Sequence, residues 1–140
     1  MNETETLLSV EILKALHAYE ARLETVVEPL GLSLAKLGVL ARLVVAGEPL
    51  PLRTLAERCA CVRSNITQLV DRLEAEKLVI RTDDPQDRRS VLAALTAKGR
   101  ERHAAGIEAL RAVEEQLLNE LTPRQRAALA EILPVLGGRG

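Results

Sequence analysis

The chain has 140 residues, a length typical of one compact domain. Its net charge of −1 argues, taken alone, against a protein that binds nucleic acid through bulk charge. The longest charge-free apolar runs are far shorter than a bilayer requires, which excludes a membrane-spanning segment.

The first third of the chain predicts two helices. Apolar residues recur at helical spacing over 13–30, and this pattern ends at Pro29-Leu30-Gly31. Ser33 is placed to cap a second helix that ends near Gly47. The following segment, EPLPL, is extended because its two prolines disfavour helix.

The middle of the chain predicts two more helices and a hairpin. The helices cover about 53–59 and 63–76 and are separated by a tight turn. Two β-prone runs, 78–82 and 90–95, then flank the polar loop DDPQDRR. We expect these two runs to pair as antiparallel strands.

The last third predicts two further helices. Thr96 caps a helix over 97–121, which at ~1.5 Å per residue is roughly 35 Å long. Thr122 begins the next helix with a proline after it and a glutamine three residues on. The chain contains one Tyr and no Phe or Trp, so its core is expected to be aliphatic.

The helices near the two ends of the chain are strongly apolar along one face. A monomer would leave much of this surface in water, and large apolar patches usually mark interfaces. A two-fold dimer built from the termini is the simplest closed arrangement. The alternative is a self-contained helical bundle.

The order helix, turn, helix, strand, basic loop, strand over 52–99 is that of a winged helix-turn-helix. Such a unit places one helix in the DNA major groove and a basic loop beside it. Residues 52–100 hold ten Lys/Arg against seven Asp/Glu, whereas the remainder holds nine against thirteen. The basic bias therefore lies where DNA contact is predicted.

The helix over 63–76 has two distinct faces. Ile66, Leu69, Val70 and Leu73 share one face and are expected to pack on the domain. The opposite face carries hydrogen-bonding side chains suited to base edges, while flanking arginines suit phosphates. Asp71 would repel phosphate, so it either pairs with an arginine or lies where the helix leaves the groove. The alternative is an ordinary polar solvent face.

The loop between the predicted strands is rich in arginine and aspartate. An arginine at its tip can enter a narrow minor groove, where the negative potential is strong. One aspartate would then brace an arginine in its reaching geometry. The alternative is a charge-balanced surface hairpin. The complete set of predicted DNA-binding residues is Arg53, Arg63, Ser64, Asn65, Thr67, Gln68, Arg72, Arg81, Arg88 and Arg89.

The segment RSNITQLVDRLEAEKLVIRTDDPQDRRSVLAALTAKG resembles the recognition helix, wing and following helix start of MarR-type transcriptional regulators. Asp87-Arg88-Arg89 matches the DxR of the wing, and 95–99 matches LTxxG. GLSLAKLGVLARL resembles the second helix of the family. Val62 departs from the pattern, because a Ser or Thr cap commonly precedes the recognition helix.

The resemblance implies a mainly α chain with a small two- or three-stranded antiparallel β wing. Residues 33–99 would form the DNA-binding lobe, and 1–31 plus 97–137 the helical dimerisation region. The homodimer would bind a pseudo-palindromic operator, most simply as a repressor, with Arg89 as the wing arginine. A small molecule or an oxidant would bind between the dimer helices and the lobe, near His17 and Tyr19. At most one of these two faces a given pocket, and the simpler interpretation of each is an ordinary packing or surface residue. No cofactor is implied.

Cys59 and Cys61 lie in the turn before the predicted recognition helix, and packing as small apolar side chains is the simplest interpretation. A thiol-based redox sensor is an alternative, since nearby arginines lower a thiol pKa. The sequence lacks nucleophile elbows, phosphate loops and metal motifs, so we expect no enzyme. The acidic N-terminus lacks a signal pattern, which predicts a cytoplasmic protein. A winged helix that binds only protein is the remaining alternative.

Overall fold

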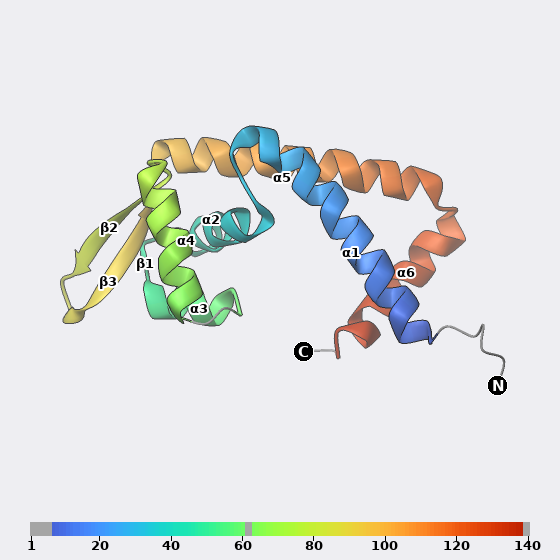
Figure 1. Ribbon diagram of the computed structural model, residues 1–140, viewed down its shortest axis with the longest axis horizontal. Helices are drawn as coiled ribbons and strands as arrows, with labels where there is room; N and C mark the ends of the chain where they lie inside the picture. Colours follow the sequence, from blue (N-terminus) through green and yellow to red (C-terminus); the bar gives the residue numbers. More distant parts are fainter. Residues whose placement is uncertain (1–6, 61–62, 139–140) are drawn as a thin grey trace.

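The computed structural model describes residues 7–60 and 63–138. It confirms the predicted fold class, a mainly helical chain with a small three-stranded antiparallel sheet (Figure 1). The elements follow in the order α1 (Leu8–Val27), η1 (Glu28–Leu30), α2 (Leu34–Ala46), β1 (Leu50–Pro51), α3 (Leu52–Arg58), α4 (Arg63–Ala75), β2 (Val79–Asp84), β3 (Asp87–Leu95), α5 (Ala97–Glu120) and α6 (Pro123–Leu136).

Three helix starts form as the sequence predicts. Ser33, Thr96 and Thr122 are extended N-caps whose hydroxyls accept the backbone N–H three residues later, at 3.1, 2.9 and 3.1 Å. Gln125 returns a bond to the Thr122 N–H at 2.9 Å and completes a capping box. These local bonds satisfy N–H groups that have no acceptor within their helix.

The hairpin is longer than the sequence predicts. Strand β2 continues to Asp84 and β3 begins at Asp87, so the turn contains only Pro85 and Gln86. The expectation of a seven-residue loop was wrong, and Arg88 and Arg89 belong to a strand. The reason is that backbone pairing near the tip is independent of side-chain polarity, because both faces there meet solvent. Strand order is β1-β3-β2.

An aliphatic core holds α2, α3, α4 and the base of the sheet together. Its largest fully buried side chains are leucine, isoleucine and valine, as the scarcity of aromatics predicts. Val27 at the end of α1 joins this cluster, and Leu110 of α5 packs against it. The members of the cluster are Val27, Leu32, Leu37, Val39, Leu40, Leu43, Leu50, Leu55, Ala56, Ile66, Val70, Leu73, Leu78, Val79 and Ala93.

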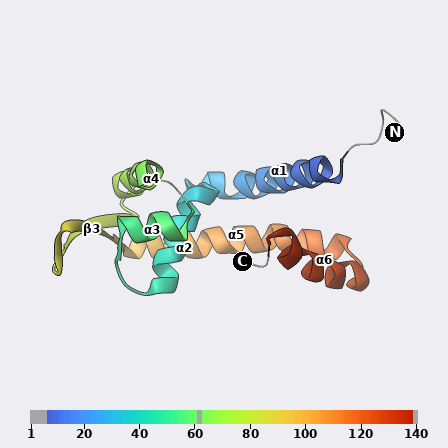
Figure 2. The same cartoon turned by 90° about the horizontal axis from the view of Figure 1, so that it is seen from below.

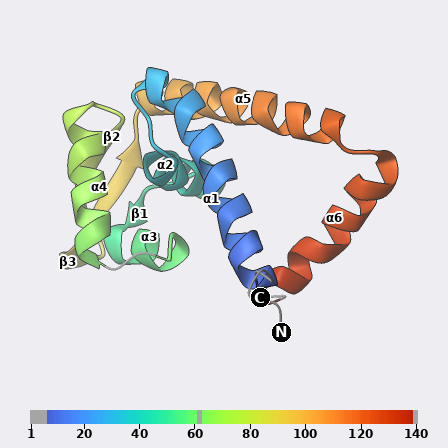
Figure 3. The ribbon, with the colours of Figure 1, turned by 45° about the vertical axis from the view of Figure 1, so that its right-hand side comes forward.

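Helices α1, α5 and α6 extend away from this core. The long α5 runs from the sheet to the opposite end of the molecule, and α1 packs against it (Figure 1). Viewed from below, α1 lies on one side and α5 with α6 on the other (Figure 2). In Figure 3 the C-terminal end of α1 lies beside α5, whereas α6 follows the far end of α5. Helix α6 has no buried residue along its described length.

Within 7–60 and 63–138, no single helix is long and apolar enough to cross a membrane. The pair Leu8–Leu30 and Leu34–Ala46 passes the length and composition test together, but it is bent by 76° at its break.

Candidate nucleic-acid interface

Helix α4 is anchored by the apolar face that the sequence predicts. Ile66, Val70 and Leu73 are fully buried, and Leu69 is half-buried against the same core. The helix packs on α3 and meets α2 through this face. Its opposite face is therefore fixed in direction and turned outward.

The exposed face of α4 carries short hydrogen-bonding side chains. Ser64, Asn65, Thr67 and Gln68 are all exposed, and Arg72 is exposed one turn further along. Arg63 begins the helix, but its side chain lies outside the described part of the structure. Amide and hydroxyl groups at this spacing match the donors and acceptors on base edges in the major groove.

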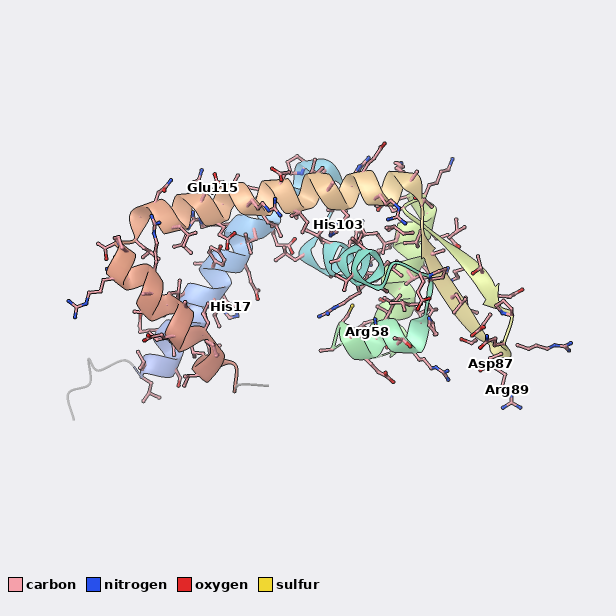
Figure 4. The ribbon with its side chains drawn as sticks, turned by 180° about the vertical axis from the view of Figure 1, so that it is seen from behind. His17, Arg58, Asp87, Arg89, His103 and Glu115 are labelled. Carbon is pink, nitrogen blue, oxygen red and sulfur yellow. The ribbon has the colours of Figure 1, made fainter. Side chains whose placement is uncertain are left out.

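Arg88 and Arg89 lie on β3 immediately after the tight turn, and both are exposed. The Asp87 carboxylate accepts the backbone N–H of Arg89 at 2.9 Å, so it fixes the strand rather than the guanidinium. Figure 4 shows Arg89 at the far end of the hairpin, directed away from the body of the molecule. Within the described residues, neither guanidinium forms an ion pair.

A groove of about 530 Å³ separates the hairpin from α3 and α4. Arg53 and Thr67 line its helical side, and Asp87, Arg89 and Ser90 line its strand side. Arg53 is exposed on the first turn of α3. The groove thus has an arginine on each wall and lies between the two elements predicted to contact DNA.

Arg81 lies differently from the other predicted DNA-binding residues. Its guanidinium faces α4, where it pairs with Asp71 and donates to Glu74 Oε1 at 2.9 Å. Burial lowers the pKa of Arg81, but the hydrogen bonds to Asp71 and Glu74 outweigh it and leave the pKa above its ordinary value. Arg81, predicted as a DNA-binding residue, therefore has its guanidinium engaged by carboxylates of α4 in this structure. The structure also shows that Asp71 pairs with an arginine.

Glu74 is a residue of this region that sequence reasoning missed. One of its oxygens accepts from the Arg81 guanidinium, and the other accepts the Arg81 backbone N–H at 3.0 Å. The signal was present, because Asp71 and Glu74 are three residues apart and share a helix face. Connecting them to Arg81 required the geometry of the intervening turn.

The cysteines and the departure from the cap pattern are only partly described. Cys59 follows α3 as its C-cap residue, is half-buried and packs against the core. Cys61 and Val62 lie outside the described residues. Ser64 falls inside α4, which begins at Arg63, so it occupies a helical position rather than the cap.

The candidate effector residues lie far from the hairpin. His17 is exposed on α1, at the other end of the molecule from Arg89 (Figure 4). Tyr19 is half-buried, and the Arg22 guanidinium lies 5.9 Å from its ring centre.

Burial lowers the pKa of His103 on α5. The described residues form no cluster of three His, Cys, Asp or Glu side chains able to hold a metal ion.

Comparison with known proteins places this geometry among transcriptional regulators. The model of the MarR family matches residues 30–90. The HTH-type transcriptional regulator YkoM of Bacillus subtilis (strain 168) is 38% identical over 71 residues, which cover 51% of this chain and 46% of that protein. The match therefore spans about half the length of this relative.

Solved structures extend the similarity to nearly the whole chain. A MarR family transcriptional regulator from Silicibacter pomeroyi is 31% identical, with a TM-score of 0.66 over 89% of this chain and 84% of that one. The organohalide-sensing regulator RdhR, solved with 2,4-dichlorophenol bound, is 26% identical, with a TM-score of 0.85 over 99% and 85% of the two chains.

Proposed function

The chain belongs to the MarR family of winged-helix transcriptional regulators, and on this premise we propose that it binds a pseudo-palindromic DNA operator as a homodimer and represses transcription. The observation that carries the proposal is the outward polar face of α4 beside a hairpin whose Arg88 and Arg89 form no ion pair among the described residues. In this proposal the protein acts in the cytoplasm.

In this proposal α4 reads base edges. Asn65 and Gln68 each present an amide able to pair with adenine, and they lie three residues apart on the exposed face. Ser64 and Thr67 add hydroxyl groups that serve either base or phosphate. Arg63 and Arg72, near the two ends of the helix, would contact phosphates and set its register.

The hairpin and α3 supply the second part of the contact surface. Arg89, with Arg88 beside it, would enter the minor groove next to the site read by α4. Arg53 stands across the groove from Arg89 and would contact the intervening backbone. Concentrating these charges on one face explains how a chain of net charge −1 can bind a polyanion.

Dimerisation is supported by the apolar side chains that α1 and α6 leave exposed. Leu16 is 50% exposed and Leu133 is 53% exposed, although leucine side chains are usually buried in a protein core. We propose that 1–31 and 97–137 pair across a two-fold axis, while 33–99 forms the DNA-binding lobe. The two-fold axis would then present two α4 helices to successive turns of the duplex.

We also propose that a small-molecule effector regulates DNA binding. Support comes from RdhR, whose structure contains 2,4-dichlorophenol. This chain has one Tyr and no Phe or Trp, so the walls of such a site would be mainly aliphatic. His17 and Tyr19 remain the candidate polar residues, on the helix that links the dimer region to the lobe.

The test is the salt dependence of duplex binding by the full chain. The probe is the duplex that the wild-type protein selects from a pool of randomised short duplexes. The logarithm of the association constant should fall steeply with the logarithm of salt concentration, because bound phosphates release counterions. A flat dependence, or no binding of any duplex, would favour a protein-interaction module instead.

Gln68→Ala then tests which element carries specificity. The variant should lose roughly 1–3 kcal/mol of discrimination at one base pair and little affinity at the others. Reselection from the randomised pool measures this directly. A uniform loss over all sequences would make Gln68 a phosphate contact.

A further inference from the structure

A network of polar contacts joins the hairpin to the middle of α4. The Arg81 guanidinium on β2 pairs with Asp71 and donates to Glu74 Oε1 at 2.9 Å. It also lies 3.4 Å from the Thr67 carbonyl oxygen, and the Arg81 N–H donates to Glu74 Oε2 at 3.0 Å. One residue of the hairpin therefore holds acceptors from two successive turns of the helix.

The acceptors fix the direction of the Arg81 side chain. Residues 67, 71 and 74 follow the three- and four-residue spacing of one helix face. A planar guanidinium offers its donors in a rigid fork, so two carboxylates on different turns define its plane. The Arg81 side chain is 24% exposed, whereas those of Glu74 and Asp71 are 41% and 59% exposed. Its guanidinium is thus turned toward α4 instead of outward.

The connection that this network spans is short and unusual. Helix α4 ends at Ala75, and Lys77 adopts a left-handed conformation with φ of 65° before β2 begins. The Leu78 N–H donates to the Leu73 carbonyl at 2.9 Å, which anchors the base of the hairpin. Arg81 lies three residues further along the chain and adds a contact between β2 and α4 beyond this base.

The network also controls the charge next to the base-reading side chains. Asp71 lies three residues after Gln68 and four after Thr67, so it borders the exposed face of α4. An unpaired carboxylate at that position would repel the phosphate backbone. Arg81 neutralises it and draws it toward the hairpin.

We propose that Arg81 is a positioning residue that sets the angle between α4 and the hairpin, and that Asp71 and Glu74 are its partners in this role. The inference rests on the proposed function, because the angle matters only if both elements contact one duplex. Correct spacing of α4 and Arg89 would then contribute to sequence discrimination without any contact between Arg81 and DNA.

The decisive variant is Asp71→Asn combined with Glu74→Gln, because a loss of negative charge acts on all duplexes alike and leaves the ratio of affinities unchanged, whereas a loss of positioning acts mainly on the selected duplex. Removing two negative charges near the interface should strengthen DNA binding if Arg81 is released to contact phosphate. If Arg81 positions the hairpin, the ratio of affinity for the selected duplex to that for the unselected pool should fall by roughly threefold to thirtyfold. The control, Glu57→Gln with Asp83→Asn, removes the same charge outside the network and should keep the ratio within about twofold.

Arg81→Lys gives a second, independent readout. A lysine retains the charge and would largely replace a phosphate contact, but its ammonium group cannot bridge two carboxylates with a planar fork. We expect Arg81→Lys to reduce the ratio nearly as much as the double variant. Arg81→Ala combined with Asp71→Asn and Glu74→Gln leaves no carboxylate unpaired; it should leave the salt slope unchanged, whereas loss of a phosphate contact would lower it by about one.

The outcomes separate this inference from the function on which it rests. Absence of salt-dependent duplex binding by the wild-type chain would overturn both. Discrimination by the wild type that persists in the double variant would overturn only the positioning role. A large fall in the melting temperature of the double variant would make the network a stability element, which would also overturn it.

Discussion

At the scale of single residues, three arginines of the hairpin have different surroundings. Arg81 is held by carboxylates of α4, whereas the Arg88 and Arg89 guanidinium groups form no ion pair among the described residues. The Arg89 backbone N–H donates to the Asp87 carboxylate at 2.9 Å, which anchors the strand and not the guanidinium. The Arg89 side chain is therefore available to DNA and contributes little to packing. An effect of its removal on DNA binding can thus be separated by experiment from an effect on stability.

Arg89→Ala should weaken binding of the selected duplex by roughly 1–3 kcal/mol while the melting temperature stays near that of the wild type. Fluorescence anisotropy at fixed salt and thermal unfolding measure the two quantities. Arg42→Ala removes the same charge from the exposed surface of α2 and serves as the control. Equal affinities of Arg89→Ala and the wild type would contradict the assignment of the hairpin as a DNA-contacting wing.

At the scale of elements, the start of α5 docks tightly on the turn that follows α4. The Thr96 hydroxyl donates to the Lys77 carbonyl at 2.7 Å and accepts the Gly99 N–H at 2.9 Å. A Cβ atom at Gly99 would lie 2.1 Å from the Leu78 carbonyl oxygen. The LTxxG pattern over 95–99 thus has a physical cause, since it joins a helix cap to the close approach of two backbones.

Gly99→Ala should destabilise the fold by roughly 1–3 kcal/mol, because the clash is with the Leu78 backbone, and the turn that precedes β2 must shift. Helix propensity alone predicts the opposite sign, a gain of up to about 1 kcal/mol. Gly38→Ala is the matched control, since nothing lies within 4 Å of a Cβ built there on α2. Chemical denaturation of the two variants should therefore give changes of opposite sign, and a stabilised Gly99→Ala would refute the docking argument.

The features that the sequence predicted correctly are those encoded over a few residues. The caps at Ser33, Thr96 and Thr122 bond to groups three residues away, and the buried face of α4 follows one helical period. The length of the hairpin and the partners of Arg81 depend on pairing across a turn. The residues involved are polar and lack a hydrophobic period, so apolar spacing in the sequence predicts neither the length of the hairpin nor the partners of Arg81.

At the scale of the whole molecule, the apolar surface is divided unevenly. The core encloses the side chains of α2, α3 and α4, but α6 buries none of its described residues. Leucines with about half of their surface exposed occur on both α1 and α6, at the end of the molecule opposite the hairpin (Figures 1 and 2). A helix that buries none of its described side chains gains little stability from its own chain, and a second copy of the chain supplies an equal apolar surface.

Leu133→Asp should therefore dissociate the proposed dimer, because assembly would bury an unpaired carboxylate. We expect the free energy of dimerisation to weaken by at least about 2 kcal/mol, which raises the dimer dissociation constant roughly thirtyfold. Sedimentation equilibrium measures the change. Val45→Asp is the control, because Val45 is 80% exposed on α2, outside the proposed interface. A wild-type chain that sediments as a monomer would contradict the dimer.

If the wild-type chain sediments as a dimer, Leu133→Asp should also lose operator affinity although its α4 is unchanged, since a single lobe engages only one half-site.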